Sequence, residues 1–316
     1  MPDKKVIAVF GATGAQGGGL AHAILNDPDS EFSVRAITRD ANSEKAKQLT
    51  QKGAEIVTAD IDNAEDLEKA LNGAYGAYFV TFFWSHMSPE KELAEAKAMA
   101  QAAKKAGLKH VIWSTLEDTR NYIPLTDDRM PTLMEKYKVP HFDAKGESDK
   151  YFTEAGVPTT FLLTSFYYDN FIYFGMGPKK GQDGKLAITL PLGDKKLAVI
   201  AAEDIGKCSY GIFKKGEELI GQTVGIAGDH LSGEDMATAL TASLGQEIGY
   251  NKIPFEVYRS FGFPGADDLA NMFQFNHDFA DDFNGIRNLE SSKAINPEIK
   301  TFDVWLSEYG SQIPIG

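Results

Sequence analysis

The residues most suited to chemistry begin with a glycine-rich segment near the start of the chain. Gly11, Gly14 and Gly17 recur at every third position after the apolar run at residues 6–10. Such a turn between a strand and a helix presents backbone N–H groups and the positive end of the helix dipole to a pyrophosphate, whose approach a Cβ atom would block. The common spacing is GxGxxG, but the position of this GxxGxxG segment after the first strand predicts a dinucleotide site.

Charged residues at the ends of the next two predicted strands bear on which dinucleotide binds. Arg39 can pair with a ribose 2′-phosphate, which favours NADP(H), whereas Asp40 could accept hydrogen bonds from the free 2′-hydroxyl of NAD(H). A solvated ion pair is the alternative for both residues. Asp60 could contact the adenine, or it could cap the next helix. We expect NADP(H) as the preferred cofactor and leave NAD(H) open.

A lysine and a histidine are the candidates for catalysis. Reductases of the short-chain type use a tyrosine as proton donor and a lysine four residues later, which lowers the tyrosine pKa and holds the nicotinamide ribose. Here the corresponding spacing is His141 to Lys145, so the lysine is present and the tyrosine is not. His141 could act as an acid near neutral pH, or it could cap the helix that follows. The sequence therefore assigns no catalytic residue.

The sequence offers no metal site by spacing. Its histidines, at positions 22, 86, 110, 141, 230 and 277, show no paired ligand spacing. The single cysteine, Cys208, excludes a cysteine-rich site and an internal disulfide. We expect no metal ion.

The elements that must position these residues alternate regularly in the first half of the chain, where apolar runs predict strands and amphipathic stretches predict helices. The predicted strands are residues 6–10, 32–38, 55–59, 75–83, 110–115 and 159–163, and the predicted helices are 20–26, 43–52, 64–71, 90–106 and 147–155. This alternation predicts an α/β fold, a Rossmann-type doubly wound sheet that is mostly parallel.

The regular alternation ends near residue 165, where aromatic residues become frequent. The elements predicted beyond it are strands at 186–190 and 223–226 and helices at 202–213 and 233–243. We expect an NAD(P)-binding domain over residues 1–165 and a smaller C-terminal α+β lobe over residues 166–316, which takes the substrate or partner. Some segments of this lobe are expected to return to the main sheet.

Composition limits the partners and the location. The 316 residues carry a formal net charge of -13 and no cluster of Lys and Arg, which disfavours direct nucleic-acid binding. No apolar stretch approaches the roughly 18 residues of a membrane helix, and the N-terminus has no signal-peptide pattern. We expect a cytoplasmic protein without membrane contact, with nuclear entry open if the source is eukaryotic.

Several longer blocks resemble the NmrA-like branch of the atypical short-chain dehydrogenase/reductases, and above all its NADPH-sensing members. The blocks are residues 9–18, 38–39, 71–75, 141–147, 262–266 and 269–273. The resemblance runs over almost the whole chain, and several of these blocks are more specific than the glycine segment.

The resemblance implies that a defined set of residues binds NADP(H). The implied residues are Gly11, Ala12, Thr13, Gly14, Ala15, Gln16 and Gly17 in the glycine segment, Arg39, Asp60 and Ile61 on the adenosine side, Thr81, Phe82, Phe83 and Lys145 on the nicotinamide side, and Tyr167, Tyr168, Asp169 and Asn170 in a loop that closes over the nicotinamide. Phe82 stands where the family pattern has asparagine. A further family lysine falls on Ala94, so its contact is missing or is made by Lys97.

The resemblance implies a sensor that reads the NADPH/NADP+ ratio and changes its conformation or its protein partner. Transcriptional regulation through a DNA-binding partner and a homodimer both belong to this hypothesis. The alternative is an NADPH-dependent reductase of a quinone, an imine or a similar small acceptor. The missing tyrosine favours a sensor, but a quinone needs little acid assistance after hydride arrives, so enzymatic activity stays open.

Overall fold

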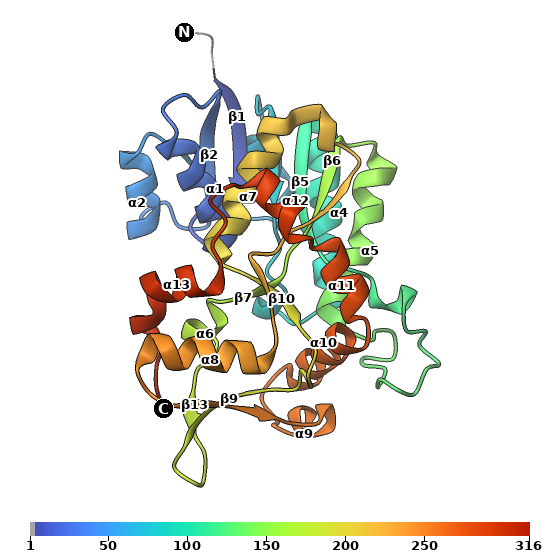
Figure 1. Ribbon diagram of the computed structural model, residues 1–316. Helices are drawn as coiled ribbons and strands as arrows, with labels where there is room; N and C mark the ends of the chain where they lie inside the picture. Colours follow the sequence, from blue (N-terminus) through green and yellow to red (C-terminus); the bar gives the residue numbers. More distant parts are fainter. Residues whose placement is uncertain (1–3) are drawn as a thin grey trace. The chain divides into compact units, whose positions relative to one another are not determined.

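The structure is a computed structural model that describes residues 4–316 (Figure 1). The chain forms two compact units that interleave along the sequence. The first unit takes the chain up to Asp118, then Ala144–Leu163 and Ala202–Val224, and the second takes Thr119–Asp143, Thr164–Ala201 and Gly225–Gly316. Residue 165, where the sequence predicts a division into consecutive domains, lies close to the crossing between Leu163 and Thr164.

A seven-stranded sheet forms the centre of the first unit. Its strands are β1 (Lys5–Phe10), β2 (Phe32–Thr38), β3 (Glu55–Thr58), β4 (Gly76–Phe79), β5 (His110–Thr115), β6 (Thr159–Leu163) and β11 (Thr223–Gly225), in the order β11-β6-β5-β4-β1-β2-β3. All pairings among β1 to β6 are parallel. The predicted Rossmann-type α/β fold is confirmed.

The position of β1 in the sheet decides where a ligand can bind. β1 pairs with β2 on one side and with β4 on the other, and Val9 lies opposite both Ala36 and Tyr78. The chain therefore adds β2 and β3 on one side of β1 and then β4 on the other side, so the strand order reverses between β1 and β4. In open parallel sheets, ligands bind outside the carboxyl ends of the strands at such a switch point.

Helices cover this sheet and close its core. They are α1 (Ala15–Asn26), α2 (Glu44–Gln51), α3 (Ala64–Leu71), α4 (Pro89–Ala106), α5 (Pro140–Ala155) and α7 (Ala202–Lys215). On one face, Phe79 and Trp113 pack with Met99 of α4 and Phe152 of α5 in a single apolar cluster. The rings of Trp113 and Phe152 stack at 5.1 Å. This packing fixes α4 and α5 beside the carboxyl ends of β4 and β5.

Helix α1 begins earlier than predicted, because the turn after β1 is shorter. Gly14 N–H donates to the Gly11 carbonyl at 2.8 Å, and the helix starts at Ala15 rather than residue 20. Gly17 therefore lies inside the helix. A Cβ atom at this position would lie 2.6 Å from the carbonyl oxygens of Gly11 and Phe10, so only glycine fits the close approach of helix and strand.

Two other predicted elements differ from the structure by more than two residues. The expected strand at 75–83 pairs only over Gly76–Phe79, and the chain then enters a short 3-10 turn at Phe83–Ser85. Helix α5 begins at Pro140, seven residues before the predicted start at 147. Proline suits the first helical position because its missing N–H would have no intrahelical partner. The Asp143 carboxylate accepts hydrogen bonds from the N–H groups of Lys138 and Val139 at 2.7 and 3.1 Å.

The second unit contains two small sheets and a series of helices. One sheet has the order β12-β10-β7 and the other β13-β9-β8. The strands are β7 (Phe166–Tyr167), β8 (Lys179–Lys180), β9 (Leu186–Leu190), β10 (Leu197–Ile200), β12 (Asp229–Leu231) and β13 (Ile248–Lys252), and the helices are α6 (Asn170–Tyr173), α8 (Gly233–Leu244), α9 (Phe255–Arg259), α10 (Ala266–Asp278), α11 (Ala280–Ile286), α12 (Leu289–Ile295) and α13 (Phe302–Tyr309). The sequence analysis predicted β9 and α8 and none of α9 to α13.

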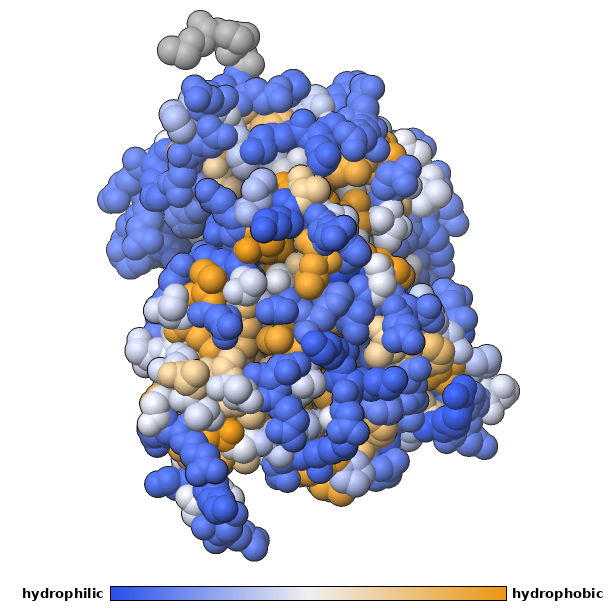
Figure 2. Space-filling model, in the orientation of Figure 1, coloured by the Kyte–Doolittle hydropathy of each residue, from blue (hydrophilic) through white to orange (hydrophobic). Residues whose placement is uncertain are grey.

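The surface agrees with the composition. Hydrophilic residues predominate on the face drawn in Figure 2, and hydrophobic residues lie between them. None of the helices within residues 4–316 combines the length and the apolar character that crossing a membrane requires.

Candidate functional site

The glycine turn lies at the carboxyl end of β1, where the sheet topology predicts a ligand. Gly14, the N-cap residue of α1, makes no side-chain cap hydrogen bond, so this helix start resembles those that bind anions through backbone N–H groups. Gln16 accepts hydrogen bonds from the Tyr78 hydroxyl of β4 and, at 2.9 Å, from the Ser114 hydroxyl of β5. These bonds fix the turn against the neighbouring strand ends.

The residues predicted on the adenosine side are mostly exposed. Arg39 is exposed and forms no ion pair within residues 4–316. The Asp40 carboxylate accepts a hydrogen bond from Asn42 N–H at 2.8 Å, and the Asp60 carboxylate accepts one from Asp62 N–H at 3.0 Å. Both aspartates thus stabilise local turns, and Arg39 remains available to an anion. Ile61 packs against the core cluster.

The first unit brings Lys145 and Thr81 together at the end of β4. Lys145 Nζ donates to the Thr81 hydroxyl at 2.6 Å and to the Thr81 carbonyl at 3.3 Å. It also forms an ion pair with Glu92 Oε1 of α4 at 2.6 Å, where Lys145 is 12% exposed and Glu92 is 0% exposed. The ammonium group lies 5.5 Å from the Trp113 ring. Lys145 is therefore held rigidly by α4, α5 and the end of β4.

The two phenylalanines predicted on the nicotinamide side differ in exposure. Phe82 is 57% exposed, whereas Phe83 is buried. Phe82 directly follows Thr81, the residue that accepts hydrogen bonds from Lys145. Lys97, the alternative to the missing family lysine, is exposed and lies 6.0 Å from the Tyr151 ring.

His141 belongs to the second unit and has a structural partner within it. Its Nδ1 atom lies 2.6 Å from Asp268 Oδ1, and its backbone N–H donates to Asp268 Oδ2 at 3.2 Å. The side chain is buried. This geometry fits the structural alternative for His141, because the imidazole anchors the start of α5 to α10.

The predicted closing loop is part of a folded core. Tyr168 is 1% exposed and packs on the rings of Phe302 and Trp305. Tyr167 belongs to β7, Asp169 stands at the N-cap of α6, and Asn170 is its first residue. That these residues close over a nicotinamide ring stays a prediction.

Three acidic residues beside Lys145 or the end of β5 were not predicted from the sequence. Glu92 and Glu95 are buried on α4, and the partly buried Asp149 on α5 accepts hydrogen bonds from Trp113 Nε1 at 2.9 Å and Thr115 Oγ1 at 2.7 Å. Burial raises the pKa of Asp149 to about 7. The burial of Glu92 could have been predicted from the sequence. Glu92, Ala96 and Met99 are spaced so that they lie on the same face of α4, and this face is apolar further along the helix.

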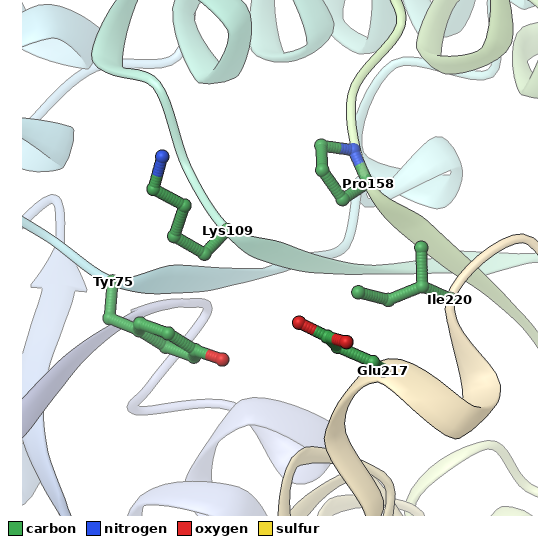
Figure 3. Close-up of a pocket in the computed structure, with 5 residues that line it drawn as sticks. All are labelled: Tyr75, Lys109, Pro158, Glu217 and Ile220. Carbon is green, nitrogen blue, oxygen red and sulfur yellow. The ribbon is translucent and has the colours of Figure 1, made fainter.

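A hollow of about 520 Å³ lies at the opposite edge of the sheet (Figure 3). It is lined by Tyr75, Lys109, Pro158, Glu217 and Ile220. Tyr75, Lys109 and Pro158 directly precede β4, β5 and β6, so the hollow faces the amino ends of these strands. It is not the dinucleotide site, which the fold places at the carboxyl ends.

A parallel sheet whose first strand ends in a glycine turn at the switch point defines a Rossmann-type α/β protein. Residues 3–306 match the model of the NmrA-like family. The chain belongs to the NmrA-like family, as its sequence blocks indicated.

Curated relatives share this family over most of their length. The chain is 28% identical over 294 residues to the NmrA-like family domain-containing oxidoreductase FrzB of Cladobotryum sp, covering 85% of this chain and 83% of the relative. It is 26% identical over 266 residues to the NmrA-like family domain-containing protein DDB_G0286605 of Dictyostelium discoideum, with 81% and 83% covered.

Solved structures show the same fold at low identity. NmrA, a negative transcriptional regulator, in complex with NADP has a TM-score of 0.77 at 22% identity, with 97% of this chain and 94% of NmrA covered. The triphenylmethane reductase of Citrobacter sp. complexed with NADP(H) has a TM-score of 0.73 at 18% identity, with 96% and 99% covered. The quinone oxidoreductase QOR2 of Escherichia coli complexed with NADPH has a TM-score of 0.71 at 20% identity, with 96% and 99% covered.

Proposed function

We propose that this protein binds NADP(H) at the glycine turn and reduces a small acceptor such as a quinone or an imine. The observation that carries the proposal is the placement of Lys145. Its ammonium group is fixed at Thr81, beyond β4, and the glycine turn follows β1, the parallel neighbour of β4. The two sites therefore share the carboxyl edge of the sheet.

Each predicted residue has a role that its chemistry supports. The N–H groups at the start of α1 would bind the pyrophosphate, and the exposed Arg39 guanidinium would pair with the 2′-phosphate. Lys145 would exchange a hydrogen bond to Thr81 for one to the nicotinamide ribose. The bound dinucleotide would supply a hydride to the acceptor.

The relatives support a reductase. FrzB and several further curated relatives carry oxidoreductase in their names. The structural neighbours include reductases that act on triphenylmethane dyes and quinones. Such acceptors take a hydride without needing a tyrosine in the place of His141.

A sensor of the NADPH/NADP+ ratio is the second candidate. It is favoured by the position of His141, which replaces the expected tyrosine and is tied to Asp268, and by the similarity to NmrA, a negative transcriptional regulator. In this case cofactor binding would change the affinity for a protein partner, which requires different cofactor affinities in two conformations. A homodimer and a cytoplasmic location belong to the same proposal.

The test combines binding and turnover. Calorimetry on cofactor-free protein should give a lower Kd for NADPH and NADP+ than for NADH and NAD+, and NADPH absorbance should fall in the presence of some member of a quinone and imine panel. Lys145→Met should abolish turnover, whereas Lys150→Met, an exposed lysine on the same helix, should not. Tight NADPH binding without turnover on any acceptor would replace the reductase with the sensor.

A further inference from the structure

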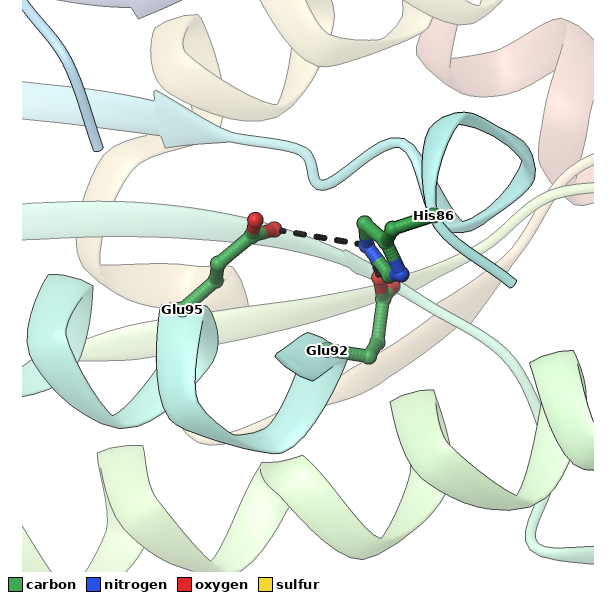
Figure 4. Close-up of side chains that lie close together, drawn as sticks. All are labelled: His86, Glu92 and Glu95. Atoms are coloured by element: carbon green, nitrogen blue, oxygen red, sulfur yellow. Dashed lines mark ion pairs between the residues drawn. The ribbon is translucent and has the colours of Figure 1, made fainter. Parts of the chain in front are cut away.

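The partly buried His86 and the buried Glu92 and Glu95 form a group that we call the α4 carboxyl cluster (Figure 4). His86 follows the 3-10 turn after β4, and both glutamates lie in the first turns of α4. His86 Nε2 lies 3.5 Å from Glu92 Oε2 and 3.9 Å from Glu95 Oε2. Each of these three atoms is buried and has no hydrogen-bond partner within residues 4–316. Three polar atoms converge without satisfying one another, which calls for an explanation.

A metal ion is one explanation, because the three atoms lie within 4.8 Å of one another. Two features oppose it. His86 Nδ1 accepts a hydrogen bond from Ser88 N–H at 3.0 Å, so the neutral ring carries its proton on Nε2, whereas a histidine that ligates through Nε2 donates from Nδ1. Lys145 already balances the charge of Glu92 at 2.6 Å, and the exposed Lys91, which pairs with Asp62 at 2.9 Å, lies 3.7 Å from Glu95. A divalent cation would leave a buried excess of positive charge.

A proton is the better explanation. Burial, followed by the neighbouring Glu92 charge, raises the pKa of Glu95 to about 7, and burial lowers the pKa of His86. The groups that face Glu95 are Glu92 and Lys91 of α4, Asp62 after β3, Lys145 of α5, and His86. At neutral pH the cluster therefore holds a neutral His86 and a Glu95 that binds and releases a proton.

We propose that Glu95 stores a proton and passes it through Glu92 to Lys145 while the acceptor is reduced. Glu92 links the two, since its Oε1 contacts Lys145 and its Oε2 faces the cluster. Rotation of the Glu95 side chain would bring the two carboxyl groups into hydrogen-bond contact. Glu95 and Glu92 are positioning residues that act through Lys145, and they provide the proton that the missing tyrosine would have supplied.

The proton and electron balance is simple, and it rests on the proposed reductase function. The bound dinucleotide would supply the hydride that turns a quinone into its anion, with NADP+ as the oxidised product. Lys145 gives its ammonium proton to that anion and becomes a neutral amine. Glu95 releases its proton to Glu92, and Glu92 passes it to Lys145. Glu95 then takes a proton from solvent.

Infrared spectroscopy tests the stored proton without turnover. The difference spectrum of wild type minus Glu95→Gln should show a protonated carboxyl band at about pH 6 that is lost at about pH 8. Glu90→Gln changes an exposed carboxyl on the same helix and should leave the band in place. Absence of the band in wild type would overturn the proposal. Tight stoichiometric zinc binding that is lost in His86→Gln would replace it with a metal site.

The pH profile of turnover tests the transfer. In wild type, kcat should be highest below pH 7 and fall as Glu95 loses its proton, at unchanged KM for NADPH. Glu95→Gln should lower kcat at about pH 6 by about tenfold or more and remove the inflection near 7. If the inflection near pH 7 persists in Glu95→Gln, it comes from Asp149, whose pKa is also about 7, and the proposal is overturned. Failure of wild type to turn over any acceptor would instead overturn the proposed function.

Discussion

At the scale of single residues, Lys145 and Glu92 form an ion pair almost wholly withdrawn from water. Desolvation makes such a pair expensive to form, and removal of one partner leaves an uncompensated charge. The pair therefore holds Lys145 in one place, but it depends on both residues being present.

We predict that Lys145→Met and Glu92→Gln each lower the free energy of unfolding by about 3 kcal/mol or more. The double variant should lower it by clearly less than the sum of the two single effects. Urea unfolding of the four proteins measures this coupling. The exposed pair Lys105 and Glu68 serves as the control, with an expected coupling below about 1 kcal/mol. Equal coupling in the two pairs would contradict the prediction.

Arg39 should decide between the two dinucleotides. Arg39→Ala removes a charged hydrogen bond worth about 1.5–3 kcal/mol, so calorimetry should show a Kd for NADPH about tenfold to a hundredfold higher. The Kd for NADH should stay within about twofold, because NADH has no 2′-phosphate. Arg129→Ala, at an exposed arginine of the second unit, should change neither value. An equal increase of the Kd for NADPH and NADH would show that Arg39 does not determine the selectivity between them.

The site residues that could be predicted from the sequence are those whose roles depend on local spacing. Lys145 follows from its spacing to His141, and the glycine turn from its place after β1. Glu92 and Glu95 escaped because charged residues near a helix start usually face solvent and favour the helix dipole. Their burial depends on how α4 packs beside β4, which is a tertiary property. His141 illustrates the same limit, since its partner Asp268 lies far along the chain.

At the scale of elements, α1 and α7 pack so closely that their backbones are in direct contact. A Cβ atom at Gly206 would lie 2.0 Å from Leu20 N, and one at Gly19 would lie 2.3 Å from the Glu203 carbonyl oxygen. Glycine on both helices permits this contact, which orders the helix that carries the glycine turn.

Gly206→Ala should therefore destabilise the protein by several kcal/mol, on the order of 3 or more, because helix backbones would have to separate. Thermal unfolding followed by circular dichroism measures the change. Gly285→Ala is the matched control, since nothing lies within 4 Å of a Cβ at this position, and it should be neutral or slightly stabilising. An unchanged melting temperature in Gly206→Ala would show that α1 and α7 can shift apart freely.

His110 should make stability depend on pH. Burial lowers its pKa from 6.5 to about 4, and the ring pairs with Thr160 between β5 and β6. Between these values the unfolded chain binds more protons, so stability rises with pH, by roughly 3 kcal/mol in total. The difference in unfolding free energy between wild type and His110→Gln should grow from about pH 4 to pH 6.5 and then level off. A difference that is independent of pH would contradict this.

The elements themselves were predicted well where their patterns are local. β2, α3, β5 and β6 have the predicted bounds, because apolar runs and polar breaks delimit them. The starts of α1 and α5 were wrong because glycine and proline were taken as loop residues, although both fit inside the first helical turn here. Beyond residue 243 the short helices α9 to α13 lack a clear apolar period and depend on packing within the second unit.

At the scale of the whole molecule, the first unit needs a segment that comes late in the sequence. Helix α7 contributes Ile205, Ile212 and Phe213 to the core of that unit, and β11 adds a strand beside β6. The first 165 residues contain the cofactor turn but not these elements.

A chain that ends at residue 165 should therefore show no cooperative unfolding transition, since it leaves the α7-facing side of α1 and the sheet exposed. A chain that ends at residue 224 contains all segments of the first unit and should retain one. Urea unfolding followed by circular dichroism compares both with the full chain. A transition of wild-type midpoint in the shorter chain would show that residues 1–165 fold alone.

The interleaving also sets a constraint on biosynthesis. The parallel strands β1 to β5 have been synthesised by residue 118, but the last segment of their unit ends at residue 224. At about 5–20 residues per second, the intervening 106 residues (224 - 118) take roughly 5 to 20 s to synthesise. During that time the nascent sheet lacks its α7 cover and its edge strand. We therefore expect the growing chain to expose apolar surface of the kind that chaperones bind until residue 224 has been synthesised.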